Sequence, residues 1–545
     1  MRYHLSLKSL LEWTTLGIFL FLVFVAFTVC YGDDVSGGWQ STDIDQAKTV
    51  DNDDLEAKVA VKPGSGIVWG TNKTKASAEP AAPVLPNLPN AEPVKPTPST
   101  PAPGTASLRQ PAPLPLKPAS PQTGVVGKTD KYLLKSSRKK GSTDLVETLL
   151  EVTGDVKQVS GDLKETRDKM EVVAGFRYEE RVHQFSPTEQ IVSVRQYNLA
   201  KSKMKIGDQV KMPELPSELQ TIVCSLDRDQ VSLFSPHGSL RGEQLLLIED
   251  MPGNTLTIDR LLPNTEVGIG ESWKISDNVL RSFLAVDAVL SSNVEAVLTA
   301  VADNMAMIEM VGDVSGIYLG AATEMSIRAK FQFDLSIQRI NWLGAMFEEN
   351  RSIGHVGPGL DLVARLQVKI SPIDSPQTLT DAALMTVSTR PSPAILQLKY
   401  DGGKGPWGFS HDRSWYVYQD DPQATVLRKL INGELVAQCN IADMGTVDLK
   451  TMTTLQKFQQ DLIAGLGDNF GKVAAAGEYT DKRGYKVYKV LLDGIVDDLS
   501  LRWIYHLLTD KEGKQSVVVF VVEAAMLDQF DNADDVLLEM YRMGK

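Results

Sequence analysis

The residues best placed to do chemistry lie in and beside one glycine-rich segment, Gly354-His355-Val356-Gly357-Pro358-Gly359-Leu360-Asp361. Four ionisable side chains gather there: Arg351, His355, Asp361 and Arg365. Two arginines near an imidazole and a carboxylate favour an anionic ligand or, if the side chains converge, acid–base chemistry on a polymer of the cell envelope. The glycines permit positive φ values and a close approach of backbone to ligand. A wide turn between two strands needs the same residue types, so that alternative stays open.

A second polar cluster is His411-Asp412, next to Arg413. The carboxylate could orient the imidazole for proton transfer. The alternative is a turn before a strand, in which Asp412 accepts hydrogen bonds from backbone donors.

The remaining motifs argue against a metal, a cofactor or a catalytic nucleophile. No two of the six histidines have the spacing of metal ligands on one helix face, and there is no Cys-x-x-Cys pair. Gly471-Lys472 is followed by Val473, so the Ser or Thr of a phosphate-binding loop is missing. No Gly-x-Ser-x-Gly elbow occurs in the regions expected to fold. We therefore predict no catalytic residue, no metal and no cofactor.

Alternating apolar and polar residues dominate the part of the chain that carries the glycine-rich segment. Such alternation predicts strands with one buried and one solvated face. Five segments show it after Leu261: 294–298, 305–311, 325–335, 338–347 and 363–370. Similar segments occur between residues 149 and 234. Together they predict one large, curved, half-barrel-like antiparallel sheet over residues 144–371, with short helices near 240–250 and 277–284.

Residues 394–545 predict a smaller α/β sandwich, which makes the overall fold class α+β. Asn432-Gly433 marks a tight hairpin, and Thr453 or Thr454 begins an amphipathic helix. Three strands and a closing helix follow. The run Ser516–Val522 is apolar on both faces, which predicts a central strand.

Composition bounds the partners. The 545 residues contain 56 Lys and Arg against 69 Asp and Glu, a net charge of −13. A chain this acidic is a poor nucleic-acid binder, since phosphate affinity depends on clustered cations. One basic run, Lys128 to Lys140, could touch anionic lipid; the alternative is a solvated linker flank.

The N-terminus predicts export. Basic residues precede the uncharged run 14–32, which is long enough for membrane contact as an anchor and ends in small residues compatible with cleavage. We expect an extracytoplasmic protein, periplasmic or secreted, with the choice between signal peptide and anchor open.

The predicted order is a signal or anchor segment (1–32), a Pro-rich linker (33–143), the curved sheet (144–371), a second linker (372–393) and the α/β region (394–545). Cys224 and Cys439 fall in different regions. They are interpreted as two buried free thiols, with an interdomain disulfide as the alternative.

The order hairpin, helix, long antiparallel strands and closing helix in residues 394–545 resembles the PsbP-like α/β sandwich family, best in Trp503–His506 and Ser516–Glu523. That resemblance implies a binding or assembly module without catalytic residues. Residues 144–371 resemble the curved-sheet lipid-carrier proteins of bacterial envelopes in outline. The whole chain is similar to exported proteins of planctomycete-type bacteria, which implies a compartment and no activity.

These observations favour a non-enzymatic envelope protein that binds an apolar ligand, such as a lipid, or a protein partner. The alternative is an enzyme acting on an envelope polymer through Arg351, His355 and Asp361. It requires those three side chains to meet in one cleft.

Overall fold

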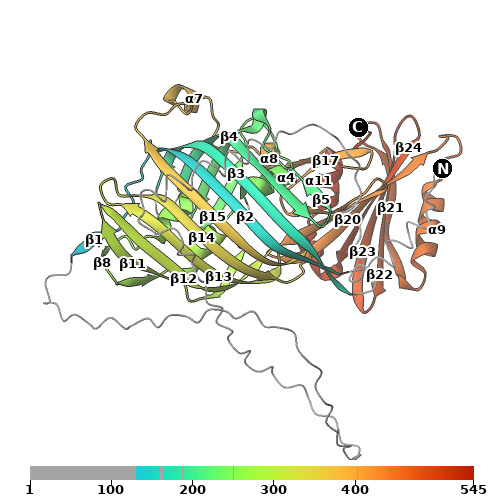
Figure 1. Cartoon of the computed structure of the whole chain (residues 1–545). Coiled ribbons are helices and arrows are strands. Elements are labelled where there is room, and N and C mark those ends of the chain that lie inside the picture. The colour runs from blue at the N-terminus through green and yellow to red at the C-terminus, as the bar shows by residue number, and fades with distance from the viewer. Residues whose placement is uncertain (1–129, 160–163, 187–189, 250, 402, 545) are drawn as a thin grey trace, which may run out of the picture. The chain divides into compact units, whose positions relative to one another are not determined.

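Long antiparallel strands form most of this protein, and two large sheets hold nearly all of them (Figure 1). The computed structural model describes residues 130–159, 164–186, 190–249, 251–401 and 403–544. The predicted signal segment 1–32, most of the Pro-rich linker and Cys30 lie outside this range. None of the helices within it is long and apolar enough to cross a membrane.

The first sheet contains thirteen strands in the order β7-β6-β4-β3-β2-β15-β14-β13-β12-β11-β9, with β5 on β4 and β10 on β12. Its longer strands are β2 (Thr143–Val159), β3 (Glu165–Phe185), β4 (Gln190–Ile206), β12 (Met305–Tyr318), β13 (Ala321–Asp334), β14 (Arg339–Arg351) and β15 (Gly359–Ile373). The shorter ones are β5 (Gln209–Lys211), β6 (Thr221–Asp227), β7 (Gln230–Phe234), β9 (Ser272–Lys274), β10 (Ala288–Ser292) and β11 (Glu295–Ala302). β1 (Lys131–Leu133) and β8 (Glu266–Gly268) pair separately.

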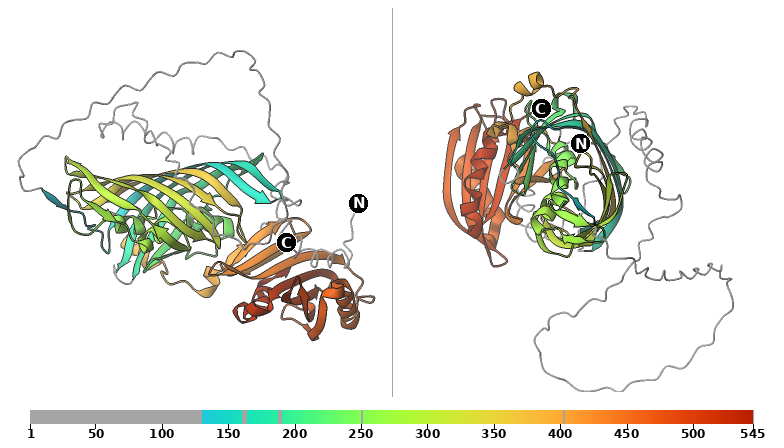
Figure 2. Two further views of the ribbon diagram at one scale, coloured as in Figure 1. Left: turned by 90° about the horizontal axis from the view of Figure 1, so that it is seen from below. Right: turned by 90° about the vertical axis from the view of Figure 1, so that its left-hand side faces the viewer.

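The sheet curves around three short helices, as the end-on view in Figure 2 shows. These are α4 (Gly242–Glu249), α5 (Thr255–Ile258) and α6 (Asp277–Leu284). Their apolar side chains, such as Leu256 and Phe283, join the inward side chains of the strands in one core. The curved antiparallel sheet is therefore confirmed, and it is open because its end strands β7 and β9 do not pair with each other. Ser276 is the N-cap of α6.

The antiparallel register places the strand turns at two opposite ends of the sheet. The β12–β13 and β14–β15 turns share one end with the tips of β2, β3 and β4. We call this the cavity end. The opposite end holds a buried network of three arginines and three carboxylates: Arg138, Arg195, Arg339, Asp144, Glu180 and Asp259.

Arg138 changes the interpretation of the basic run. Its side chain is 2% exposed and pairs with Asp144, Glu180 and Asp259. This residue is therefore part of the fold, and neither a lipid contact nor a solvated flank. The packed chain begins at β1, ahead of the predicted start at Asp144.

The predicted second linker contains two short helices, α7 (Asp381–Met385) and α8 (Pro393–Leu396). Residues 377–379 of this segment are bound to β3, because the Glu179 carboxylate accepts hydrogen bonds from the backbone N–H groups of Gln377, Thr378 and Leu379.

The second sheet is antiparallel and has seven strands in the order β18-β19-β20-β24-β23-β22-β21. They are β18 (Trp415–Asp420), β19 (Ala424–Ile431), β20 (Glu434–Thr446), β21 (Phe470–Thr480), β22 (Lys486–Val496), β23 (Leu499–Thr509) and β24 (Lys514–Glu523). A small sheet of β16 (Leu398–Tyr400), β17 (Trp407–His411) and β25 (Arg542–Met543) packs with it. β24 is central, as its two apolar faces predict.

One face of this sheet packs on α9 (Leu455–Leu466) and the other on α10 (Leu527–Phe530) and α11 (Ala533–Met540). Thr454 is the N-cap of α9, as predicted. The closing helix is divided, because Asp531 and Asn532 adopt left-handed conformations between α10 and α11. This break rotates α11, so Leu538 is buried while Val536 is 53% exposed.

Cys224 and Cys439 are buried free thiols in the two different sheets, as the favoured interpretation predicts.

Candidate functional site

The cavity end of the large sheet borders a cavity of about 2380 Å³. Its walls come from the tips of β2, β3, β4 and β15, from α4 and α6, and from β16 and β18 of the region after residue 397. Pockets for drug-sized molecules measure roughly 300–1,000 Å³, so this cavity has room for a larger ligand.

The sheet contributes an apolar wall. Val156, Met170, Met204, Ile206 and Leu360 line the cavity. The register puts them on one face, since Met170 pairs with Ile206 across β3 and β4. Lys203 and Lys205 alternate with this wall and are exposed on the other face of the sheet. Methionine adapts to irregular apolar shapes, which suits a wall that contacts a flexible molecule.

The β12–β13 hairpin and β14 add a polar rim. The guanidinium of Arg351 lies over the Tyr318 ring, 3.8 Å from its centroid. The same group pairs with Glu349 at 2.6 Å, and Glu349 also accepts a hydrogen bond of 2.9 Å from Thr323. Arg351 is therefore held rigidly at the cavity rim, with its charge compensated.

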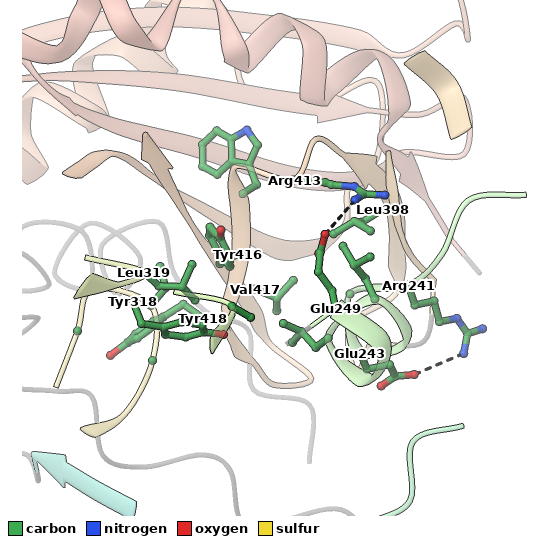
Figure 3. A pocket seen from close by; sticks show the side chains of 18 of the residues that line it. Arg241, Glu243, Glu249, Tyr318, Leu319, Leu398, Arg413, Tyr416, Val417 and Tyr418 are labelled. Carbon is green, nitrogen blue, oxygen red and sulfur yellow. Dashed lines mark ion pairs between the residues drawn. The ribbon is translucent and has the colours of Figure 1, made fainter. Parts of the chain in front are cut away.

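The facing wall comes from β18 and its neighbour β19. Tyr416, Val417 and Tyr418 of β18 line the cavity together with Tyr318 and Leu319 of the β12–β13 hairpin (Figure 3). Behind them, Arg428 lies over the Tyr418 ring at 3.7 Å and donates a hydrogen bond to the carbonyl oxygen of His355. Burial raises the pKa of the Tyr418 hydroxyl, against the opposing effect of Arg428.

Arg413 ties this wall to the helix inside the curve. It donates to the carbonyl oxygen of Leu233 at 2.7 Å and pairs with Glu249 of α4 at 3.5 Å, the latter drawn dashed in Figure 3. The cavity is thus bounded by two sheets held together by arginine contacts.

The structure does not bring the four predicted site residues together. Arg351 and Leu360 are paired across β14 and β15, and both face the cavity. Asp361 and Arg365 lie on the outer face of β15, because side chains alternate between the two faces of a strand. Asp361 pairs there with exposed Arg167 at 3.4 Å. His355 is exposed, and its backbone accepts the hydrogen bond from Arg428. Partial desolvation, followed by the charge of Arg428, lowers the pKa of the His355 imidazole.

The glycine-rich segment is the turn between β14 and β15. Gly354 donates its N–H to Gly357 at 3.0 Å. None of its three glycines has a positive φ, which differs from the conformation that the sequence suggested. A Cβ on Gly359 would lie 3.0 Å from the carbonyl oxygen of Arg351, so the glycine permits the close approach of these two backbone segments.

His411-Asp412 forms a turn between β17 and β18. Asp412 accepts hydrogen bonds from the backbone N–H and the hydroxyl of Ser414, as the turn interpretation predicts. Burial lowers the pKa of the His411 imidazole.

A buried polar cluster that the sequence did not indicate lies under α11. His506 Nε2 is 3.0 Å from Asp534, and the Lys489 ammonium contacts Asp534 at 2.8 Å and Asp535 at 2.9 Å. His506, Asp534 and Asp535 place three potential ligand atoms within 4.8 Å of one another. The Lys489 ammonium contacts both carboxylates and so compensates one of their two negative charges.

Comparisons with known proteins add little beyond fold. No protein-family model matches the chain, and a search of curated proteins finds no relative. Among solved structures, the cyanobacterial PsbP (CyanoP) of Synechocystis matches at 15% identity and a TM-score of 0.22, over 28% of this chain and 96% of that one.

Two further matches reach a TM-score of 0.11 each. OmpF of Salmonella typhi, in complex with daunomycin, is 8% identical over 70% of this chain and 97% of its own. An outer membrane channel of Pseudomonas putida is 9% identical over 71% of this chain and 97% of its own. The predicted likeness to PsbP therefore holds as a weak likeness in fold, and scores this low carry no functional argument.

Most of the residues that line the cavity were not predicted from the sequence. Its apolar wall was implicit in the alternation of β4, where Met204 and Ile206 share one face. The contribution of β18 was not accessible, because no local pattern tells which surface of a second sheet lies beside the first.

Proposed function

We propose that this protein is a non-enzymatic, extracytoplasmic binding protein that holds an apolar ligand, of lipid type, in the cavity at the end of its large sheet. The observation that carries the proposal is the apolar wall of Val156, Met170, Met204, Ile206 and Leu360 beside a cavity of about 2380 Å³. The run 14–32 supports the compartment through its sequence alone.

Binding would follow from burial of apolar surface. Each methylene transferred from water into an apolar site contributes about 0.8 kcal/mol, and an acyl chain provides many of them. Part of this gain is offset by the lost freedom of the ligand. A preformed wall keeps that cost low on the protein side, because the strands around it are already ordered by the core.

We favour binding over the enzyme alternative, which requires Arg351, His355 and Asp361 to meet in one cleft. Asp361 faces away from Arg351 on the neighbouring strand, and His355 contributes its backbone to an interdomain contact. No second function is proposed for these residues.

The test is native mass spectrometry of the purified full chain, before and after delipidation and incubation with a phospholipid extract. We expect bound lipid in both the native and the reloaded samples. A Met204→Trp variant should lose most of this lipid, because the larger ring fills the space next to Ile206. Lys205→Trp is the matched control, since its side chain lies on the opposite face of the same strand. Equal lipid content in both variants, or none in the wild-type protein, would overturn the proposal.

A further inference from the structure

One arginine in the cavity has no compensating partner. Arg281, in the last turn of α6, lines the cavity and is half-buried. Within the described part of the chain, no carboxylate lies within ion-pair distance of its guanidinium, and that group donates no hydrogen bond.

Among the described residues, each of the other arginines that line the cavity has a carboxylate partner. Arg351 pairs with Glu349, Arg413 with Glu249, and Arg241 with Asp401 at 2.8 Å. The acid nearest to Arg281 along the chain that also lines the cavity is Asp287, whose carboxylate accepts the backbone N–H of Leu319 at 2.5 Å. Arg281 is therefore the cavity guanidinium that still has its hydrogen-bonding capacity free.

The position of Arg281 is fixed by its helix. Leu280, Phe283 and Leu284 form one face of α6 that is buried in the core, and Arg281 and Ser282 beside that face line the cavity. A cation in the last turn is stabilised by the helix dipole, so the position alone does not require a ligand. What points to a ligand is the missing carboxylate partner, because a ligand that fills the cavity would also displace the water around the guanidinium.

Filling the cavity changes the energy of this charge. An uncharged apolar ligand would remove water from the guanidinium and offer no acceptor in return, which is costly for a buried charge. A ligand with an anionic group would replace that water with charge-assisted hydrogen bonds. The cavity thus selects for a molecule that combines an apolar body with an anion.

We infer that the ligand of the proposed site is an anionic amphiphile, whose carboxylate or phosphate headgroup pairs with Arg281 while its apolar chain lies against the wall of Met170, Met204 and Ile206. This inference rests on the proposed function and specifies its ligand class. Arg281 is a ligand-binding residue and has no catalytic part.

The experiment compares charged and uncharged ligands with the same chains. Binding of radiolabelled oleate and oleyl alcohol, and of dioleoylphosphatidate and dioleoylglycerol, is measured by equilibrium dialysis with the full chain. The wild-type protein should prefer the anionic member of at least one pair. The pair that shows the preference distinguishes a fatty-acid carboxylate from a lipid phosphate.

Arg281→Gln should weaken binding of that anionic ligand about tenfold or more, the usual scale of a lost charge-assisted hydrogen bond, and leave the uncharged ligand unaffected. Arg281→Lys should restore part of the affinity. Arg365→Gln, an exposed arginine on the outer face of β15, is the matched control and should bind both ligands like the wild type.

Three outcomes would overturn the inference. One is equal binding of the anionic ligand by Arg281→Gln and wild type. Another is an equal loss of both ligands in Arg281→Gln, which would give Arg281 a structural role. The third is a wild-type preference for the uncharged ligands. If the wild-type protein binds none of the four ligands, the proposed function fails as well, so the two failures are distinguishable.

Discussion

Gly320 and Gly433 meet backbone to backbone at the tips of two hairpins, one from each large sheet. Gly320 ends the turn between β12 and β13, and Gly433 ends the turn between β19 and β20. A Cβ on Gly320 would collide with the carbonyl oxygen of Gly433. Both glycines have positive φ, +76° and +82°, as two-residue hairpin turns require. The turn chemistry of each hairpin thus also permits the contact between them.

The first prediction is that Gly320→Ala separates these two turns. The new methyl group cannot be accommodated, so the residues around Gly433 should exchange their amide hydrogens faster. The matched control is Gly484→Ala, which has a similar φ of +87° but open space around its Cβ. Both variants carry about 1 kcal/mol of backbone strain, and the exchange at residues 431–434 should change in Gly320→Ala alone. Identical exchange in the two variants would contradict a contact that holds the regions together.

The second prediction concerns the buried network at the opposite end of the sheet. Glu180 is 1% exposed and binds Arg195 at 2.8 Å, Arg138 at 3.3 Å and Thr255 at 2.7 Å. Glu180→Gln leaves two buried arginines short of one negative charge, so the free energy of unfolding should fall by about 3–5 kcal/mol. Glu147→Gln removes a more exposed pair with Arg177 and should cost about 1 kcal/mol or less. Denaturant unfolding followed by circular dichroism measures both.

The third prediction is that Glu180 makes the free energy of unfolding depend on pH in the acid range. Burial by itself raises the pKa of the Glu180 carboxyl, but Arg195 and Arg138 outweigh it and lower the pKa from 4.5 to about 2. A carboxyl with a lower pKa in the folded state contributes stability above pH 4.5 and loses it as the pH falls toward 2. The wild-type protein should lose stability over this interval more steeply than Glu180→Gln. Parallel curves for the two proteins would show that other carboxylates govern acid unfolding.

The sequence reveals those parts of the fold that depend on local alternation. The strands from 294 to 370 were predictable because their buried faces repeat every second residue, and β24 because its continuous apolar run is typical of a central strand. β21 was missed, since Phe470–Thr480 is an edge strand rich in Ala and Gly with almost no buried face. The closing helix was predicted as one element because Asp531 and Asn532 do not interrupt the apolar pattern, although their left-handed backbone does interrupt the helix.

The candidate site was harder to predict for a physical reason. Asp361 looked like a partner of Arg351 in sequence, yet pairing across β14 and β15 puts Arg351 beside Leu360 and turns Asp361 to the other face. Arg281 carries no local signal, because what distinguishes it is the absence of a carboxylate on elements far away in the chain. Such properties follow from the tertiary arrangement alone.

The last prediction concerns His506. Its imidazole is fully buried, and burial lowers its pKa below the ordinary value of 6.5 even though Asp534 raises it. A base with a lower pKa in the folded state takes up its proton more readily when unfolded, so stability should decrease as the pH falls below 6.5. This single group can contribute at most about 1.4 kcal/mol per pH unit. His506→Gln keeps a donor for Asp534 and removes the titration, so its unfolding free energy should fall less than that of the wild type between pH 6.5 and pH 5. An unchanged slope in His506→Gln would mean that the folded protein already holds His506 protonated, paired with Asp534 beside the Lys489 ammonium.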